Sequence, residues 1–342
     1  MEVFSMSLIV YGLILGAILL MLGIFLGVFS SPYVRVKRYR EEHYFVDPSS
    51  GKKVKFPSLQ DDPTVTLSVI IPAYNEQDRL PIMLDECLEF LEEREKKTQG
   101  FTYELIIVSD GSNDKTVEVA SDYSSKYGSE KIKVLELIQN RGKGGAVRLG
   151  MLSARGAILL FADADGATKF AELEKLEQYL SLLCKADIIK DQATIAKKHA
   201  IVCGSRAHLE EEAVASRTFF RTLLMHGFHL AVWLLATQKI RDTQCGFKLL
   251  TRETAKICFS NLHVERWAFD VELLYIADCF NIPVGEVAVT WTEIPGSKIV
   301  PVLSWIQMGR DLVLIWLRYK VGAWKLTKNP DYSKLYGEQA TC

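Results

Sequence analysis

The sequence predicts an α/β protein built on a wound, mostly parallel sheet flanked by helices, with one transmembrane helix ahead of it. Three observations support this prediction. Short aliphatic runs alternate with helical stretches between Val65 and Ala162, a pattern typical of parallel strands joined by helical crossovers. A polar cluster follows each run, as expected where ligands bind at the carboxyl ends of such strands. The stretch Met6–Phe29 carries no charged residue and is long enough to cross a bilayer core of roughly 30 Å.

Composition excludes some classes of function. The chain has 342 residues, 49% of them hydrophobic, and a formal net charge of −1. This length suffices for a large core, and the near-neutral charge gives no electrostatic basis for a nucleic-acid partner. The seven cysteines are odd in number and none lie at metal-ligand spacing, so we expect reduced thiols in a cytosolic compartment.

The N-terminal region is expected to hold a membrane anchor, residues 1–30, followed by a linker. A cleaved signal peptide is the alternative, but the apolar run exceeds the usual signal core and no positive residue precedes it. Lysines and arginines follow between Arg35 and Lys55, so the positive-inside rule puts the C-terminal body in the cytosol. Residues 31–63 show no clean period and are expected to be a basic linker near anionic headgroups.

The folded domain is expected over residues 64–298 and begins with a regular alternation of strands and helices. A β-branched run stops at Pro72, and leucines then recur at helical spacing. Asn113 or Asp114 can cap the helix that follows the second strand. The predicted strands are Val65–Ile71, Glu104–Val108, Ile132–Ile138 and Ala157–Leu160, and the helices between them lie around Leu80–Lys97, Val117–Tyr123 and Ala146–Ala154.

The second half is less regular. The stretch Phe219–Leu235 is apolar but short and contains two histidines, so an interfacial or core helix is expected rather than a span. Residues 299–342 are expected to form an amphipathic, membrane-associated helix and a tail. The other predicted elements are helices at Leu173–Leu183 and Trp267–Phe280 and strands at Ala200–Cys203 and Val284–Trp291.

Two carboxylates, Asp163 and Asp165, come directly after the fourth predicted strand. Alternate residues of an extended chain point the same way, and Gly166 lets the chain turn sharply. Like charges this close favour a cation between them, and hard oxygen ligands suit Mg²⁺ or Mn²⁺. Two solvated loop aspartates are the alternative for so short a pattern. The polar clusters at neighbouring strand ends favour the metal site.

Those neighbouring clusters contain further candidates for binding a phosphorylated ligand. Glu76 and Asp110 follow the first two strands, although a helix-dipole carboxylate and a turn residue are their ordinary roles. Arg141 and Lys143 lie among glycines that let the backbone approach a phosphate, the alternative being a solvated basic loop. Arg206 follows a later strand and suits a bidentate phosphate contact.

The motifs resemble a known family. Ser68–Glu76, Val108–Ser112 and Ala162–Asp165, in that order and spacing, resemble the inverting family-2 glycosyltransferases of the GT-A fold over about residues 66–295. Within the family, the segments Gly204–Arg206, Gln244–Lys248 and Arg266–Asp270 look like the branch that acts on polyprenyl phosphates.

The resemblance extends to the eukaryotic members that glucosylate dolichyl phosphate, which are similar in the single N-terminal anchor, in Asn140–Gly145 and in Asp165–Thr168. Mannosyl-transferring relatives often carry Gln two residues after the second Asp, where this chain has Ala167. That departure leaves the complete set of metal ligands open.

The resemblance implies a reaction and roles for the residues. The enzyme would transfer glucose from UDP-glucose to dolichyl phosphate with inversion, supplying a lipid-linked glucose donor for protein N-glycosylation on the cytosolic face of the endoplasmic reticulum membrane. Asp163 and Asp165 would hold Mg²⁺ or Mn²⁺ near the diphosphate. Glu76 and Asp110 would face the ribose and uracil. The remaining donor-site candidates are Pro72, Ala73, Tyr74, Arg141, Lys143, Arg206 and Lys248.

The acceptor decides whether a general base is needed. A phosphate monoester is mostly dianionic at neutral pH and can attack the anomeric carbon unaided. A hydroxyl acceptor would need a base, for which Asp242, Asp270 and Glu272 are candidates, with a polar helix face as the alternative for the last two. Transfer from GDP-mannose and a catalytically silent, membrane-tethered nucleotide-sugar binder stay open as alternatives.

Overall fold

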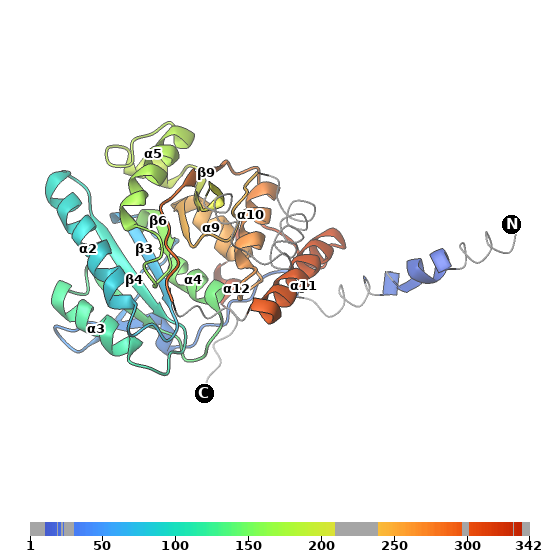
Figure 1. The fold of residues 1–342 in the computed structure, drawn as a ribbon, viewed down its shortest axis with the longest axis horizontal. Helices are drawn as coiled ribbons and strands as arrows, with labels where there is room; N and C mark the ends of the chain where they lie inside the picture. The colour runs from blue at the N-terminus through green and yellow to red at the C-terminus, as the bar shows by residue number, and fades with distance from the viewer. Residues whose placement is uncertain are drawn as a thin grey trace, which may run out of the picture.

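A seven-stranded sheet lies at the centre of the protein (Figure 1). The computed structural model describes residues 11–18, 20, 21, 23, 31–208, 239–295, 301–330 and 332–336. The strands are β3 (Val65–Ala73), β4 (Tyr103–Ser109), β5 (Ile132–Glu136), β6 (Gly156–Ala162), β7 (Ile201–Ser205), β8 (Phe247–Thr251) and β9 (Val284–Ala288). Their spatial order is β5-β4-β3-β6-β8-β7-β9. Only β8 runs antiparallel to its neighbours within this sheet.

Helices cover both faces of the sheet. Along β3, Leu67, Val69 and Ile71 enter one core while Ile70 enters the other, because side chains alternate across a strand. The first core is completed by α2 (Leu80–Lys97), α3 (Thr116–Tyr127), η2 (Phe170–Glu172), α5 (Leu173–Cys184) and α6 (Gln192–Ala196), and the second by α4 (Lys143–Leu152), α9 (Arg252–Asn261) and α10 (Phe269–Cys279). The mostly parallel sheet flanked by helices is confirmed.

The order of the elements places the ends of four strands at one edge of the sheet. Parallel β3, β4 and β6 end there at Ala73, Ser109 and Ala162, and antiparallel β8 begins there at Phe247. The backbone N–H of Asp163 donates to the carbonyl of Gly246 at 3.1 Å, which joins the end of β6 to the start of β8. The loops that follow these strands therefore share one rim.

The segment 31–63, expected to be a linker, is packed on the domain instead. It contains η1 (Glu41–His43) and the antiparallel pair β1 (Tyr44–Val46) and β2 (Lys53–Lys55). Its apolar side chains join the core beside α4; they are Val34, Val36, Phe45, Phe56 and Leu59. Isolated apolar residues among charged ones give no clean period, although each can fill a place in a core built by other elements.

The C-terminal region closes on the same segment. Helix α11 (Pro301–Lys320) and the short α12 (Tyr332–Leu335) follow β9. Ile315 of α11 is buried with Ala268 and Trp324, and the N–H of Val36 donates to the carbonyl of Leu335 at 2.7 Å. The C-terminal region is therefore bound to the segment 31–63.

None of the helices in the described ranges is long and apolar enough to cross a membrane. Most of the predicted anchor Met6–Phe29, and all of the predicted interfacial helix Phe219–Leu235, lie outside the described residues. The anchor therefore stays a prediction.

Candidate active site

The two predicted metal ligands lie at the rim where β6 ends. Asp165 accepts the N–H of Ala167 at 3.0 Å, and a guanidinium nitrogen of Arg79 is 4.0 Å from its carboxylate. Burial and, next, the charge of Asp163 raise the pKa of Asp165 above its ordinary value. A negative charge at this position is therefore disfavoured unless a positive charge lies close to it.

The carboxylate of Asp163 is held at close range by its neighbours. Lys143 Nζ lies 2.6 Å from Asp163 Oδ1. On the other side is Gly246, where an added Cβ would lie 2.1 Å from Asp163 Oδ2. Glycine at that position therefore makes room for the carboxylate.

Lys143 is the first residue of α4 and its ammonium faces a negative site. Burial alone would lower the pKa of Lys143, but the charges of Asp163 and Asp270 raise it above the ordinary value. The side chain is 16% exposed and that of Asp163 is 36% exposed. The pair is thus open to a ligand from the rim.

Two carboxylates make an incomplete set of metal ligands. Over the described part of the chain, no three His, Cys, Asp or Glu side chains gather where they could hold a metal ion. Mg²⁺ is commonly bound through one or two carboxylates together with substrate phosphates and water. Asp163 and Asp165 fit that kind of site, in which a ligand's phosphates and water would supply the other ligands.

Asp110, which follows β4, holds the loop before α4. Its Oδ1 accepts the N–H of Arg141 at 2.7 Å and its Oδ2 accepts the N–H of Gly142 at 2.8 Å. Burial raises the pKa of Asp110 to about 6, although both backbone N–H groups favour the charged form. A carboxylate has about four lone-pair positions, so these two bonds do not use all of them.

Glu76 is fixed by a residue that the sequence analysis missed. Both its oxygens accept hydrogen bonds from Arg79, at 2.5 and 2.6 Å. Both residues lie in the turn before α2, where the N–H of Arg79 donates to the carbonyl of Glu76 at 3.1 Å, so helical spacing gave no signal for the pair. Arg79 also approaches Asp165, so it links the loop after β3 to the loop after β6.

The three residues at the end of β3 have different surroundings. Pro72 is half-buried within β3, Ala73 is buried and Tyr74 is 36% exposed. The carbonyl of Ala73 accepts the N–H of Asp110 at 2.9 Å. This stretch therefore lies beside Asp110, and its role in binding a nucleobase stays a prediction.

Arg206 follows β7 and is bound to Asp242. Its Nε and Nη2 donate to the two carboxylate oxygens at 2.8 and 3.0 Å, and its guanidinium lies over the ring of Trp291, with 5.4 Å to the centroid. The side chain is 28% exposed. Asp242, a candidate base, thus serves here to orient Arg206, and its pKa is lowered by Arg206 against the effect of burial.

Lys248 and Asp270 form a pair that is closed to solvent. Lys248 Nζ donates to Asp270 Oδ1 at 2.6 Å and to the carbonyl of Cys245 at 2.7 Å. The side chains are 0% and 4% exposed. Burial raises the pKa of Asp270, and the charges of Lys248 and Lys143 oppose it. Both side chains are closed to solvent, and their roles in binding a donor or acceptor stay predictions.

Glu272 and Arg141 also have internal partners. Glu272 is buried and accepts the N–H groups of His263 and Val264 and the hydroxyl of Tyr319, which fastens α11 to α10. Arg141 turns away from the rim and binds Glu42, with 2.8 Å between Nη2 and Oε2. Its backbone, rather than its guanidinium, faces Asp110.

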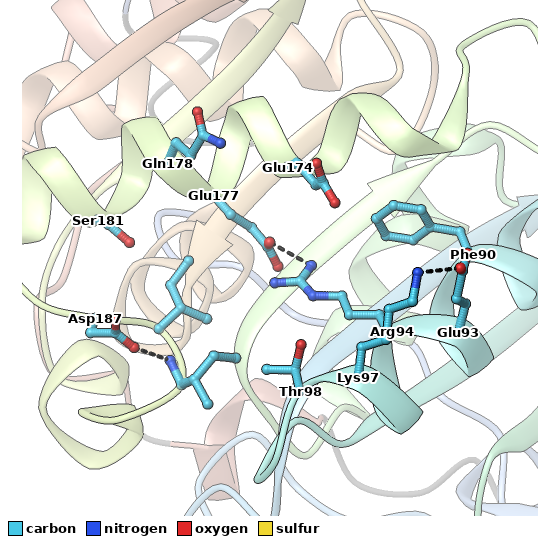
Figure 2. Close-up of a pocket in the computed structure, with 12 residues that line it drawn as sticks. Phe90, Glu93, Arg94, Lys97, Thr98, Glu174, Glu177, Gln178, Ser181 and Asp187 are labelled. Carbon is cyan, nitrogen blue, oxygen red and sulfur yellow. Dashed lines mark hydrogen bonds and ion pairs between the residues drawn. The ribbon is translucent and has the colours of Figure 1, made fainter.

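A cavity of about 420 Å³ lies between α2 and α5, and Figure 2 shows Arg94 and Glu177 pointing toward one another across it. Arg94 lies fourteen positions after Leu80 at the rim end of α2, which is roughly 20 Å along a helix. None of the predicted site residues lines this cavity. It is separate from the carboxylate rim.

The sequence of the chain matches a known protein family. The profile of glycosyl transferase family 2 matches residues 68–255. The chain therefore belongs to glycosyl transferase family 2.

Relatives within that family have a common name. A dolichyl-phosphate beta-glucosyltransferase of Drosophila melanogaster is 61% identical over 87% of this chain and 88% of its own length. The Homo sapiens protein of the same name is 57% identical over 84% of this chain and 86% of its own length. The Saccharomyces cerevisiae protein is 39% identical over 90% of this chain and 93% of its own length.

Solved structures show weaker similarity. A glucosyl-3-phosphoglycerate synthase from Mycobacterium tuberculosis, crystallised with Mg²⁺ and UDP, has a TM-score of 0.47 and 18% identity, covering 75% of this chain and 80% of that one.

Proposed function

We propose that this protein transfers glucose from UDP-glucose to dolichyl phosphate with inversion, giving dolichyl β-D-glucosyl phosphate. The observation that carries the proposal is the 61% identity over 87% of the chain with a dolichyl-phosphate beta-glucosyltransferase. The carboxylates and lysine gathered at one rim support it, because they are the groups that a nucleotide-sugar diphosphate needs.

Electrostatics argue for a divalent cation at Asp163 and Asp165. One pair of unit charges 4 Å apart repels by about 4 kcal/mol at an effective dielectric constant of 20. A diphosphate beside two carboxylates would involve several such pairs. Mg²⁺ or Mn²⁺ held by Asp163 and Asp165 would offset this repulsion. When bound, the cation would also stabilise the departing UDP as a Lewis acid.

The other rim residues have roles that need no proton transfer. Lys143 can leave Asp163 for a phosphate oxygen of the donor, and Arg206, oriented by Asp242 through Nε and Nη2, can offer Nη1 to a phosphate. Asp110 and the strand end Pro72–Tyr74 would bind the nucleoside. The acceptor phosphate is mostly dianionic at neutral pH. It can attack the anomeric carbon on the face opposite UDP without a general base.

The same proposal includes the place of reaction. The uncharged stretch Met6–Phe29, followed by basic residues, supports a single-pass anchor in the endoplasmic reticulum membrane with the catalytic domain in the cytosol. Anchoring would raise the local concentration of a lipid acceptor. The product would then supply glucose for protein N-glycosylation.

One assay tests the reaction directly. Full-length protein is given radiolabelled UDP-glucose or GDP-mannose, with dolichyl phosphate and a divalent cation. We expect label in the lipid fraction from UDP-glucose. Label entering lipid only from GDP-mannose, or from neither donor, would contradict the proposal.

A further inference from the structure

The donor loop before α4 is held from outside the catalytic motifs. This loop, Ile138–Gly142, provides the two N–H groups that Asp110 accepts and leads directly into Lys143. Lys143 in turn contacts Asp163. The path of the loop therefore sets the position of Lys143 and of the two N–H groups that Asp110 accepts.

Glu42 of η1 fixes this loop at two points. Its Oε1 accepts the N–H of Ile138 at 3.1 Å, where the loop begins. Its two oxygens also accept Nη2 of Arg141, at 3.1 and 2.8 Å. Glu42 is 0% exposed, and the side chain of Arg141 is 6% exposed. Buried, charge-assisted hydrogen bonds of this kind hold their partners more firmly than exposed ones.

The segment that carries Glu42 is itself fastened to α4. The N–H of Tyr39 donates to Glu42 Oε2 at 2.9 Å, and Arg38 donates to the carbonyl of Glu42. The same guanidinium reaches Ser153 Oγ at 2.8 Å, at the other end of α4. Residues 38–42 thus contact α4 at its C-terminal end and the donor loop at its N-terminal end.

We propose that Glu42 is a positioning residue for nucleotide-sugar binding. It acts through Arg141 and keeps the donor loop in the position where its N–H groups bind Asp110 and Lys143 reaches Asp163. The residue lies outside the family profile, which begins at residue 68. The proposal rests on one part of the proposed function, namely that the rim binds UDP.

The test is UDP binding by full-length Glu42→Gln, measured by calorimetry with Mn²⁺. The variant keeps the size of the side chain but loses the charge that Arg141 faces. We expect the UDP dissociation constant and the KM for UDP-glucose to rise about tenfold, because hydrogen bonds to charged groups are lost. The KM for dolichyl phosphate should not change.

A matched control is Glu41→Gln, because Glu41 is its exposed neighbour in η1 and undergoes the same change of charge. It should bind UDP like the wild type. A double-mutant cycle with Arg141→Gln should show that the double variant is no worse than either single one, since both remove the same contact. Additive losses would contradict action through Arg141.

A purely structural role would give a different pattern. The melting temperature of Glu42→Gln would fall while its UDP dissociation constant stayed at the wild-type value, and this result would overturn the proposal. Should Glu42→Gln not fold, Glu42→Asp keeps the charge but is too short to reach both Arg141 and Ile138, and normal UDP affinity in it would count equally against the proposal. If the wild type binds UDP but transfers no glucose, the proposed function fails while this inference stands.

Discussion

Two lysine–aspartate pairs in this protein have the same length and opposite surroundings. Lys143–Asp163 and Lys248–Asp270 both show 2.6 Å between nitrogen and oxygen. The first pair opens to the rim, with side chains 16% and 36% exposed, whereas the second is 0% and 4% exposed. The distance alone does not tell a pair that can exchange partners from a pair that stabilises the fold, but burial does.

The largest expected effect is on stability, from Asp270→Asn. The change leaves the Lys248 ammonium buried without its counter-charge, so we expect a loss of about 3–5 kcal/mol in the free energy of unfolding. Urea denaturation measures it. The matched change Asp163→Asn should cost less than about 1 kcal/mol, because that pair is partly exposed.

Two results bear on this prediction. The double variant Lys248→Met with Asp270→Leu should recover most of the stability, since replacing a buried ion pair by apolar side chains is often neutral. Equal losses for Asp270→Asn and Asp163→Asn would show that burial does not separate the two pairs.

The second effect is on catalysis, from Asp165→Asn. If this carboxylate holds a divalent cation, turnover should fall by about 10²-fold or more, as expected for several kcal/mol of lost transition-state stabilisation. Circular dichroism should show an unchanged fold. Near-normal glucose transfer at saturating Mn²⁺ would refute a metal role for Asp165.

The predicted elements and the missed contacts show what sequence can reveal. The rim was predictable because strands alternating with helices bring consecutive strand ends to one edge, and Asp110 and Asp163 each follow such an end. The partners of those residues were not predictable. Lys248 was expected to contact the donor, but its side chain is buried against Asp270. This pairing could not be predicted, because sequence spacing does not report which face of β8 points inward.

The same limit applies to the N-terminal segment. Glu42 has no periodic context, and its contact with Arg141 joins residues 99 positions apart. Long-range pairing of this kind depends on how finished elements pack. Sequence reasoning that works from local patterns therefore found the loop but not what holds it.

A smaller effect is expected for Lys143→Met, which removes the exchangeable cation at the rim. We expect the KM for UDP-glucose to rise about tenfold, as for loss of one charge-assisted hydrogen bond. The KM for dolichyl phosphate should stay the same. Steady-state kinetics with each substrate varied in turn gives both values, and a change confined to dolichyl phosphate would assign Lys143 to the acceptor instead.

The smallest effect is a pH dependence of metal-dependent UDP binding. The raised pKa of Asp165 means that its carboxyl keeps a proton to higher pH than an ordinary aspartate. A cation competes with that proton, so affinity for UDP with Mn²⁺ should weaken as the pH falls from neutral into the acid range. The dependence should be shallower in Asp165→Asn, and an equally steep one would assign it to another group.

Calorimetric titration of UDP into the full-length protein, with and without Mn²⁺, tests the central claim most directly. The claim is that Asp163 and Asp165 bind a nucleoside diphosphate through a divalent cation. We predict tight binding with Mn²⁺, much weaker binding without it, and loss of the difference in Asp165→Asn. Equal affinity with and without the metal, or no heat in either titration, would contradict it.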